Sequence, residues 1–249
     1  MRFEKKVAIV TGSGGGIGEG YAKRLASEGA SVVVADINTE GAERVAKEIA
    51  GDGGAAIAVT VDISDLDSTQ AMAQAAVDGF GGIDYLVNNA AIYGGMRVDT
   101  LLTVEWDYYD RFMQVNLNGA LRCVRSCYEA IAARGGGAIV NQSSTAAWMA
   151  AGYYSLAKAG INSLTACLAA ELGPMSIRVN AVAPGPIDTQ ATRDMVPEEF
   201  QQGLLAQMAI KRLGNPDDLA GTVAFLLSDD ARWLTGKTIA VDGGQVVQI

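Results

Sequence analysis

Short runs of apolar, mostly β-branched residues recur along the chain, and longer stretches with helical spacing separate them. The runs are nearly continuous in apolar character, as strands buried on both faces of a parallel sheet must be. They cover residues 7–10, 32–35, 56–61, 85–87, 138–141, 178–182 and 238–241. Because strand and helix alternate throughout, the pattern predicts right-handed βαβ crossovers and an α/β fold with a doubly wound parallel sheet of about seven strands.

The same pattern points to one domain over residues 1–249. A chain of 249 residues, 49% of them hydrophobic, is sufficient for one continuous core. No internal repeat, low-complexity tract or proline-rich linker marks a boundary. The segment 187–212 differs, because it combines Pro197 with clustered polar residues and a helix-like stretch at 198–208. We expect this segment to form a mobile lid over the substrate site.

Charge and composition exclude several classes of function. The formal net charge of -9 and the pI near 4.6 disfavour nucleic acid and anionic membranes as partners. No apolar run approaches the ~18 residues of a membrane span, and no signal-like segment stands at the start, so we expect a cytoplasmic protein. Three cysteines form no metal-ligand or disulfide pattern, so no metal site is predicted. The absence of histidine excludes Ser-His-Asp hydrolysis, histidine general bases and the usual zinc enzymes.

A glycine-rich turn follows the first apolar run and leads into a helix. Residues 12–18 read Gly-Ser-Gly-Gly-Gly-Ile-Gly. Such a turn permits unusual backbone angles and lets helix N-terminal N–H groups face a pyrophosphate, as in Rossmann-like folds. On its own it could be only a flexible loop. The candidate contacts to a dinucleotide are Gly12, Ser13, Gly16, Ile17 and Gly18.

Carboxylates end the second and third predicted strands. Asp36 lies eighteen residues after Gly18, where it would accept hydrogen bonds from the adenosine ribose hydroxyls. No Arg or Lys follows at once to hold a 2′-phosphate, so the sequence favours NAD over NADP. Asp62, followed by Ile63, could bind the adenine amino group, although a cap for the next helix explains it nearly as well.

The clearest chemical signal is Tyr154 followed by Lys158. In a helix these two side chains project from one face, one turn apart. We expect the lysine ammonium to lower the pKa of the phenol by stabilising the phenolate, which would make Tyr154 a usable proton acceptor. Tyr153 has Ala157 four residues on instead of a lysine, so we interpret it as a packing residue.

With these motifs in order, the whole sequence closely resembles the compact form of the short-chain dehydrogenase/reductase family, and within it the 3-oxoacyl-ACP reductase branch. The resemblance is carried by residues 11–18, 88–91, 116, 139–144, 154–158, 179–185 and 241–244. It implies interconversion of a secondary alcohol and a ketone by hydride transfer, with Tyr154 as the general acid/base. It also implies a homotetramer, to which helical stretches at 116–133 and 155–172 would contribute two-fold contacts.

The resemblance assigns further site residues. Lys158 would also hold the nicotinamide ribose, Ser144 would contact the substrate oxygen, and Asn116 would anchor a water that relays protons. The nicotinamide carboxamide would be held by the backbone of Ile187 and the hydroxyl of Thr189. The remaining cofactor contacts that it implies are Ile63, Asn89, Pro184 and Gly185.

Two spacings depart from the family pattern. The gap from Ser144 to Tyr154 is about three residues short, which leaves the choice between Ser143 and Ser144 open although the strand alignment favours Ser144. The stretch 106–116 is about three residues longer than in the family pattern. An apolar set, which could border the substrate or serve only in packing, comprises Trp106, Tyr108, Tyr109, Trp148 and Met149.

The main expectation is therefore an NAD-dependent oxidoreductase for a hydrophobic or cyclic secondary alcohol or ketone. A 3-oxoacyl-ACP or CoA thioester reductase is the alternative, favoured by residues 212–220 and 241–244, although Asp36 speaks for NAD and hence for degradative chemistry. A third hypothesis, from another class, is a nucleotide sensor or scaffold that keeps the fold without catalysis. The complete set of Asn116, Ser144, Tyr154 and Lys158 argues against it.

Overall fold

Seven parallel strands form the centre of the molecule, and each overlaps one of the predicted apolar runs. The computed structural model describes residues 1–195, 203, 205, 206 and 208–246. The strands are β1 (Val7–Thr11), β2 (Ser31–Asp36), β3 (Ala55–Thr60), β4 (Tyr85–Asn88), β5 (Gly137–Gln142), β6 (Ile177–Pro184) and β7 (Thr238–Val241). They pair in the order β3-β2-β1-β4-β5-β6-β7, with every pairing parallel. The predicted doubly wound sheet is confirmed.

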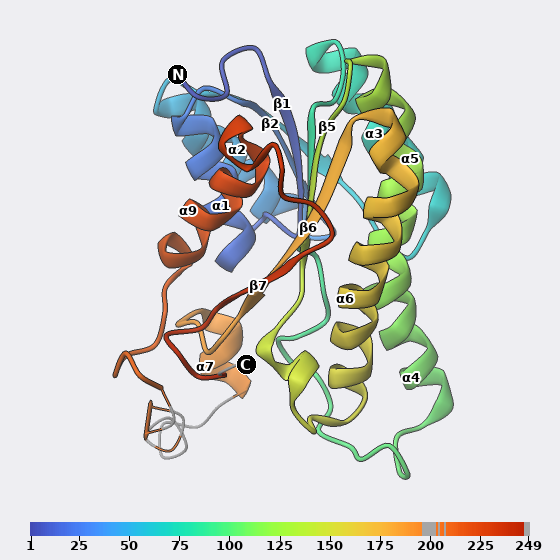
Figure 1. Ribbon diagram of the computed structural model, residues 1–249, viewed down its shortest axis with the longest axis vertical. Helices are drawn as coiled ribbons and strands as arrows, with labels where there is room; N and C mark the ends of the chain where they lie inside the picture. The colour runs from blue at the N-terminus through green and yellow to red at the C-terminus, as the bar shows by residue number, and fades with distance from the viewer. Residues whose placement is uncertain (196–202, 204, 207, 247–249) are drawn as a thin grey trace.

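Helices cover both faces of this sheet and make a three-layer α/β/α domain (Figure 1). One face carries α1 (Gly16–Ser27), α2 (Thr39–Gly51) and α9 (Pro216–Leu227). The other carries α3 (Leu66–Phe80), α5 (Gly119–Ala133) and α6 (Gly152–Leu172). Helix α4 (Trp106–Met113) runs into α5 through a π-helical turn (Gln114–Asn118), and the short α7 (Gln190–Met195) follows β6.

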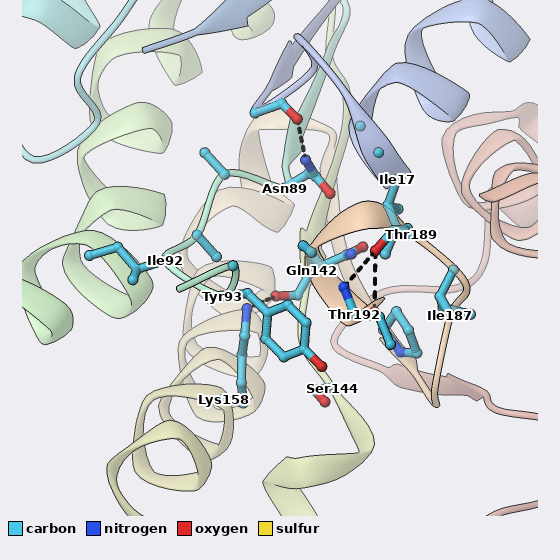
Figure 2. Close-up of a pocket in the computed structure, with 18 of the residues that line it drawn as sticks. Ile17, Asn89, Ile92, Tyr93, Gln142, Ser144, Lys158, Ile187, Thr189 and Thr192 are labelled. Carbon is cyan, nitrogen blue, oxygen red and sulfur yellow. Dashed lines mark hydrogen bonds between the residues drawn. The ribbon is translucent and has the colours of Figure 1, made fainter. Parts of the chain in front are cut away.

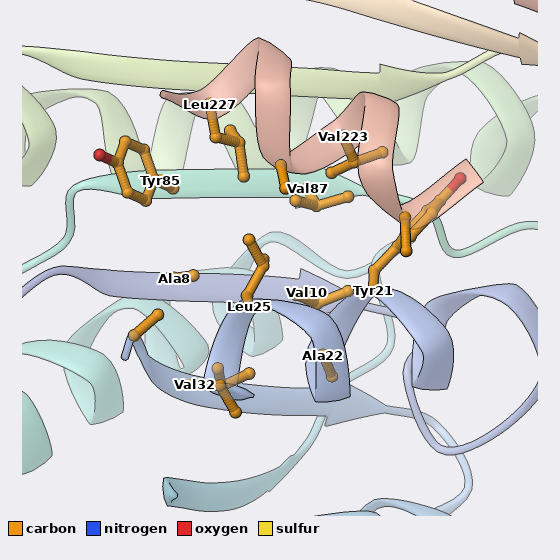
Figure 3. Close-up of a cluster of buried hydrophobic side chains, with 14 of the residues drawn as sticks. Ala8, Val10, Tyr21, Ala22, Leu25, Val32, Tyr85, Val87, Val223 and Leu227 are labelled. Atoms are coloured by element: carbon orange, nitrogen blue, oxygen red, sulfur yellow. The ribbon is translucent and has the colours of Figure 1, made fainter. Parts of the chain in front are cut away.

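Alternate residues of each strand enter different cores. Figure 3 shows Ala8 and Val10 of β1 packed with Leu25 of α1 and Val223 of α9. Ile9, between them in sequence, belongs instead to the core beneath α3, α5 and α6. Because both sets are fully buried in β1 and in the other inner strands nearly so, these strands carry no polar alternation, and their apolar runs appear continuous in the sequence.

A polar cap fixes the start of α9. The Asn215 side chain accepts a hydrogen bond from the Asp218 backbone N–H, and Asp218 in turn accepts from the Asn215 N–H, with Pro216 in the first turn. Arg212 binds both carboxylate oxygens of Asp218, at 2.6 and 2.8 Å. The sequence around residues 212–218, which suggested the 3-oxoacyl-ACP reductase branch, therefore starts a helix in this structure.

The strand order reverses between β1 and β4, so a crevice opens beyond their carboxyl ends, the usual ligand position in an open α/β sheet. Of the predicted lid at 187–212, the described part bridges Ile187 to Gly214 and continues into α7. Most of the helix-like stretch expected at 198–208 lies outside the described residues. Among those that are described, no helix is both long and apolar enough to cross a bilayer.

Candidate active site

A cavity of about 820 Å³ lies at the carboxyl edge of the sheet. It runs from the ends of β2 and β3, past the glycine-rich turn, to the start of α6 and the loop after β6. All of the predicted site residues except Ser13 and Asn116 line this cavity. Those on its wall are Gly12, Gly16, Ile17, Gly18, Asp36, Asp62, Ile63, Asn89, Ser144, Tyr154, Lys158, Pro184, Gly185, Ile187 and Thr189.

The glycine-rich turn is closed by contacts that only glycine permits. Gly12 has a φ of +65°, and a Cβ on Gly18 would stand 2.1 Å from the Gly12 carbonyl oxygen. The Asn89 amide donates to the carbonyl oxygens of Thr11 and Gly12, each at 2.9 Å, and so ties this turn to the end of β4 (Figure 2). The first turn of α1 thus faces the cavity with its backbone N–H groups, which suits a pyrophosphate.

Asp36 lies at one end of the cavity, at the tip of β2. Its two carboxylate oxygens accept from the backbone N–H groups of Gly14, at 2.8 Å, and Asn38, at 2.9 Å. These bonds fix the carboxylate and leave it further acceptor capacity. The neighbouring Arg44 is engaged elsewhere, because its guanidinium binds Glu19, Glu48 and the Gly14 carbonyl oxygen.

Asp62 also lines the cavity but already has partners. Its Oδ1 accepts from the backbone N–H of Ser64 at 2.8 Å and from the Ser64 hydroxyl at 2.6 Å. The hydroxyl bond holds the pKa of Asp62 below its ordinary value. Both sequence interpretations are therefore compatible with the structure, since Oδ1 caps the turn and Asp62 still borders the cavity.

Tyr154 and Ser144 face each other at the other end of the cavity. Burial raises the pKa of Tyr154 from 10.0 to about 12, and a hydrogen bond with the Ser144 hydroxyl partly opposes that rise. The Lys158 Nζ lies 5.8 Å from the centre of the Tyr154 ring. The expected lowering of the phenol pKa by lysine is not seen here, because burial of the phenol raises its pKa.

Lys158 is buried and is held by a backbone group. Its Nζ donates to the Gln142 carbonyl oxygen at 2.9 Å (Figure 2). Burial lowers the pKa of this amine from 10.5 to about 8. The ammonium is thus poised close to neutral pH, unlike a surface lysine.

The two adjacent serines have different surroundings. The Ser143 hydroxyl donates to the Lys158 carbonyl oxygen at 3.2 Å and to the Asn162 side chain at 2.6 Å, both on α6. The Ser144 hydroxyl accepts from the Ala146 N–H and faces Tyr154. The geometry therefore favours Ser144 over Ser143 as the substrate contact, in agreement with the strand alignment.

Asn116 lies in the π-helical turn between α4 and α5. Its side chain forms two hydrogen bonds with the Ile92 backbone, accepting from the N–H at 2.7 Å and donating to the carbonyl at 3.1 Å. The amide is thus used to hold the loop after β4. A π-turn often marks a functional site, because it breaks the regular pairing of backbone carbonyls.

One sequence expectation needs correction, and the structure decides one choice that the sequence left open. Ser13 is fully buried and absent from the cavity wall: its hydroxyl donates to the Val10 carbonyl and accepts from the Ala35 N–H, so it pins the turn to β2. Of the apolar set proposed around the substrate, only Met149 lines the cavity. Trp106 is 76% exposed, and Tyr108 packs on Phe112, as does Tyr153.

Sequence reasoning missed residues that the fold brings to the cavity. The Tyr93 ring lies 5.7 Å from that of Tyr154, centre to centre, and the Gln142 side chain reaches the cavity from β5. Thr192 on α7 bonds to Thr189 (Figure 2). Tyr93 follows the Asn-Asn-Ala-Ala segment at the strand-order reversal, and that position was the only available signal.

Comparison with known proteins identifies the family. A family model described as enoyl-(acyl carrier protein) reductase matches residues 12–245. The solved structure of a candidate short-chain alcohol dehydrogenase from Sinorhizobium meliloti is 34% identical and superposes with a TM-score of 0.93, covering 100% of both chains. The chain belongs to the short-chain dehydrogenase/reductase family.

Two curated relatives of this short-chain dehydrogenase/reductase extend the comparison. An uncharacterized oxidoreductase of Mycobacterium tuberculosis is 60% identical over 246 residues, which cover 99% of each chain. The 7alpha-hydroxysteroid dehydrogenase of Bacteroides fragilis is 38% identical over 249 residues, covering 99% of this chain and 96% of that protein.

The family implies a nicotinamide dinucleotide as cofactor, and the cavity fits one. Glycine lets the turn beside helix α1 pack closely and leaves its cavity side open. An added Cβ at Gly12 would stand 2.7 Å from the Ala90 Cα, whereas one at Gly16, on the cavity wall, would enter open space. The protein is therefore an oxidoreductase of this family that uses NAD or NADP.

Proposed function

We propose that this protein is an NAD-dependent dehydrogenase that interconverts a neutral secondary alcohol and the corresponding ketone. The observation that carries the proposal is one continuous cavity with Asp36 at one end and Tyr154, Ser144 and Lys158 at the other. A ribose-binding carboxylate and a proton-transfer group at opposite ends of one cleft match a bound dinucleotide with its reactive ring beside the tyrosine.

The cofactor-binding residues follow from the cavity wall. Asp36 would accept from the adenosine ribose, the α1 turn would face the pyrophosphate, and Ile187 and Thr189 would hold the nicotinamide end. When bound, the nicotinamide ring supplies the hydride acceptor or donor. Two observations support a preference for NAD over NADP. Asp36 places a carboxylate where the ribose would lie, and the Arg44 guanidinium, which could otherwise bind a 2′-phosphate, is already bonded to two glutamates and a carbonyl oxygen.

Proton transfer is assigned to Tyr154. Because burial holds its pKa near 12, the phenol is protonated at neutral pH and can donate to a ketone oxygen during reduction. In the oxidation direction the same oxygen accepts the alcohol proton, and Lys158, whose Nζ lies 5.8 Å from the centre of the Tyr154 ring, is the cation nearest to that tyrosine on the cavity wall. The Ser144 hydroxyl would hold the substrate oxygen within reach of Tyr154.

The cavity wall supports a neutral, mainly apolar substrate. Around Tyr154 it is formed by side chains that include Tyr93, Ala146 and Met149. Of the described residues that line this wall, only Arg111 and Lys158 are cationic. Arg111 lies toward the adenosine end, where its charge helps to lower the pKa of Asp62. A relative that acts on a hydroxysteroid supports the same class of cyclic alcohol.

A 3-oxoacyl-ACP or CoA thioester reductase is the second candidate, favoured by the description of the matching family model. Against it, the Asp36 carboxylate on the cavity wall favours NAD, the usual partner of degradative chemistry. A panel of cyclic and acyclic secondary alcohols with NAD, and of 3-oxoacyl thioesters with NADH and NADPH, separates the two by the rate of absorbance change at 340 nm. No hydride transfer with any compound of the panel would support the sensor or scaffold interpretation instead.

A further inference from the structure

The oxygen and the nitrogen of the Gln142 side-chain amide have different surroundings. Its Oε1 accepts a hydrogen bond of 2.7 Å from the hydroxyl of Tyr21, a buried residue of α1. Strand side chains alternate between faces, so Gln142 lies on the α1 side of β5 while Asn141 and Ser143 bond to α6. The amide is thus anchored by its oxygen.

The nitrogen of this amide has no protein partner among the described residues, although Gln142 lines the cavity. A primary amide nitrogen carries two N–H donors, and anchoring of the oxygen fixes the direction in which they point. Figure 2 shows the amide directed into the cavity, away from the backbone carbonyl that holds Lys158. A donor of fixed direction is therefore presented to a ligand.

The place of Gln142 in the sheet says which part of a dinucleotide it meets. Strand β5 is the third strand from β2 in the sheet, which at about 4.8 Å per strand puts Gln142 roughly 14 Å from Asp36. If Asp36 holds the adenosine ribose, Gln142 lies beyond the pyrophosphate, next to Lys158. Its donor faces the nicotinamide half of the cofactor.

We propose that the Gln142 Nε2 group donates a hydrogen bond to an oxygen on the nicotinamide half of the bound cofactor. Tyr21 is the positioning residue that orients this amide. The inference rests on the proposed dinucleotide site and adds a contact, and a connection between α1 and β5, that neither Tyr154 nor Asp36 provides. No charge is involved, so the contact raises affinity without changing the choice between NAD and NADP.

The test is calorimetric binding of NADH, ADP-ribose and AMP to the purified full chain. Gln142→Met keeps the length of the side chain but removes the donor. We expect it to weaken NADH binding by about tenfold, equivalent to about 1.4 kcal/mol, and to leave AMP affinity within twofold. Tyr21→Phe should weaken NADH binding by about two- to threefold, because the amide keeps its donor and loses only its orientation. Tyr85→Phe is the matched control, since it removes a phenol hydroxyl from the same core without reaching Gln142.

The three ligands locate the acceptor and keep the outcomes separate. Loss of NADH affinity alone assigns the acceptor to the carboxamide, and a parallel loss of ADP-ribose affinity assigns it to the ribose or the phosphates. Equal losses for all three ligands would mean that Gln142 only supports the fold, and unchanged NADH binding would likewise overturn the inference. Failure of the wild-type protein to bind NADH would instead refute the proposed function itself.

Discussion

We expect substitution of Asp36 to change the cofactor preference, because its carboxylate is fixed by the Gly14 and Asn38 N–H groups and cannot turn away from a ligand easily. Two unit charges at 4 Å interact by about 4 kcal/mol at an effective dielectric constant of 20. A 2′-phosphate carries up to about two negative charges, so even with solvent screening we expect ~3 kcal/mol of repulsion, or about a hundredfold in affinity. Asp36→Ser removes this repulsion.

The same substitution also weakens NAD. A carboxylate accepts a stronger hydrogen bond from a ribose hydroxyl than a serine does, and the difference is about tenfold in affinity. The ratio of kcat/KM for NAD to that for NADP should therefore fall by about a hundredfold to a thousandfold. Ile37→Arg, at a 63% exposed position on the cavity wall, should lower the ratio further by supplying a phosphate partner.

The assay is steady-state kinetics with both cofactors on the wild type, Asp36→Ser and the double variant. Asp52→Ser is the matched control, because it removes one exposed carboxylate at the end of α2, outside the cavity. A wild-type enzyme that uses NADP as well as NAD would refute the reasoning. So would an Asp36→Ser ratio no different from that of Asp52→Ser.

Four further predictions follow from the site and the helices. Tyr154→Phe should lower kcat by at least ~10² with NADH affinity nearly unchanged, whereas Lys158→Ala should weaken both; substantial turnover in the phenylalanine variant would move the proton-transfer role elsewhere. Ser144→Ala should lower kcat with little change in stability, and Ser143→Ala should mainly lower the free energy of unfolding, by about 1 kcal/mol in urea titrations, because its hydroxyl bonds to α6. Burial lowers the Lys158 pKa to about 8, so below pH 8 the folded protein carries a desolvated ammonium that costs ~3 kcal/mol. Between pH 8 and 10.5 the unfolded chain binds more protons than the folded chain, so the wild-type free energy of unfolding rises with pH. Lys158→Met should therefore be more stable than the wild type below pH 8 and should lose that advantage by pH 10.5. A stability difference that does not depend on pH would contradict the buried charge. Finally, light scattering should give a tetramer mass through contacts of α5 and α6, and a monomer mass at micromolar concentration would refute this.

The fold could be predicted from the sequence because a strand buried on both faces of the sheet appears as a run of consecutive apolar residues. Each apolar run became one strand, and the glycine-rich turn joined β1 to α1 where close backbone approach demands it. The beginnings of helices were less visible. Residues 212–218 stood out as part of the family resemblance, but their spacing did not reveal the helix cap and the Arg212–Asp218 ion pair that they form.

Candidate site residues were placed on the cavity wall correctly where their signal is local in sequence. Tyr154 and Lys158 share a helix face, and Asp36 ends a strand, so their spacing reveals them. Tyr93 and Gln142 were missed because each meets the cavity only through tertiary structure. Ser13 was misplaced since the direction of a side chain in a tight turn depends on backbone angles that the sequence does not reveal. The Tyr154 pKa was misjudged because desolvation depends on the surrounding packing.

Successive side chains at the end of β5 and just after it point alternately toward α6 and toward the cavity, and this alternation matters for laboratory evolution. Asn141 and Ser143 bond to α6, so most substitutions there should reduce the yield of folded protein. Gln142 and Ser144 face the cavity, so variation at those positions samples new ligand contacts with less cost to the scaffold. A library restricted to codons 142 and 144 would therefore contain a higher fraction of folded variants than one that randomises the whole segment 141–144.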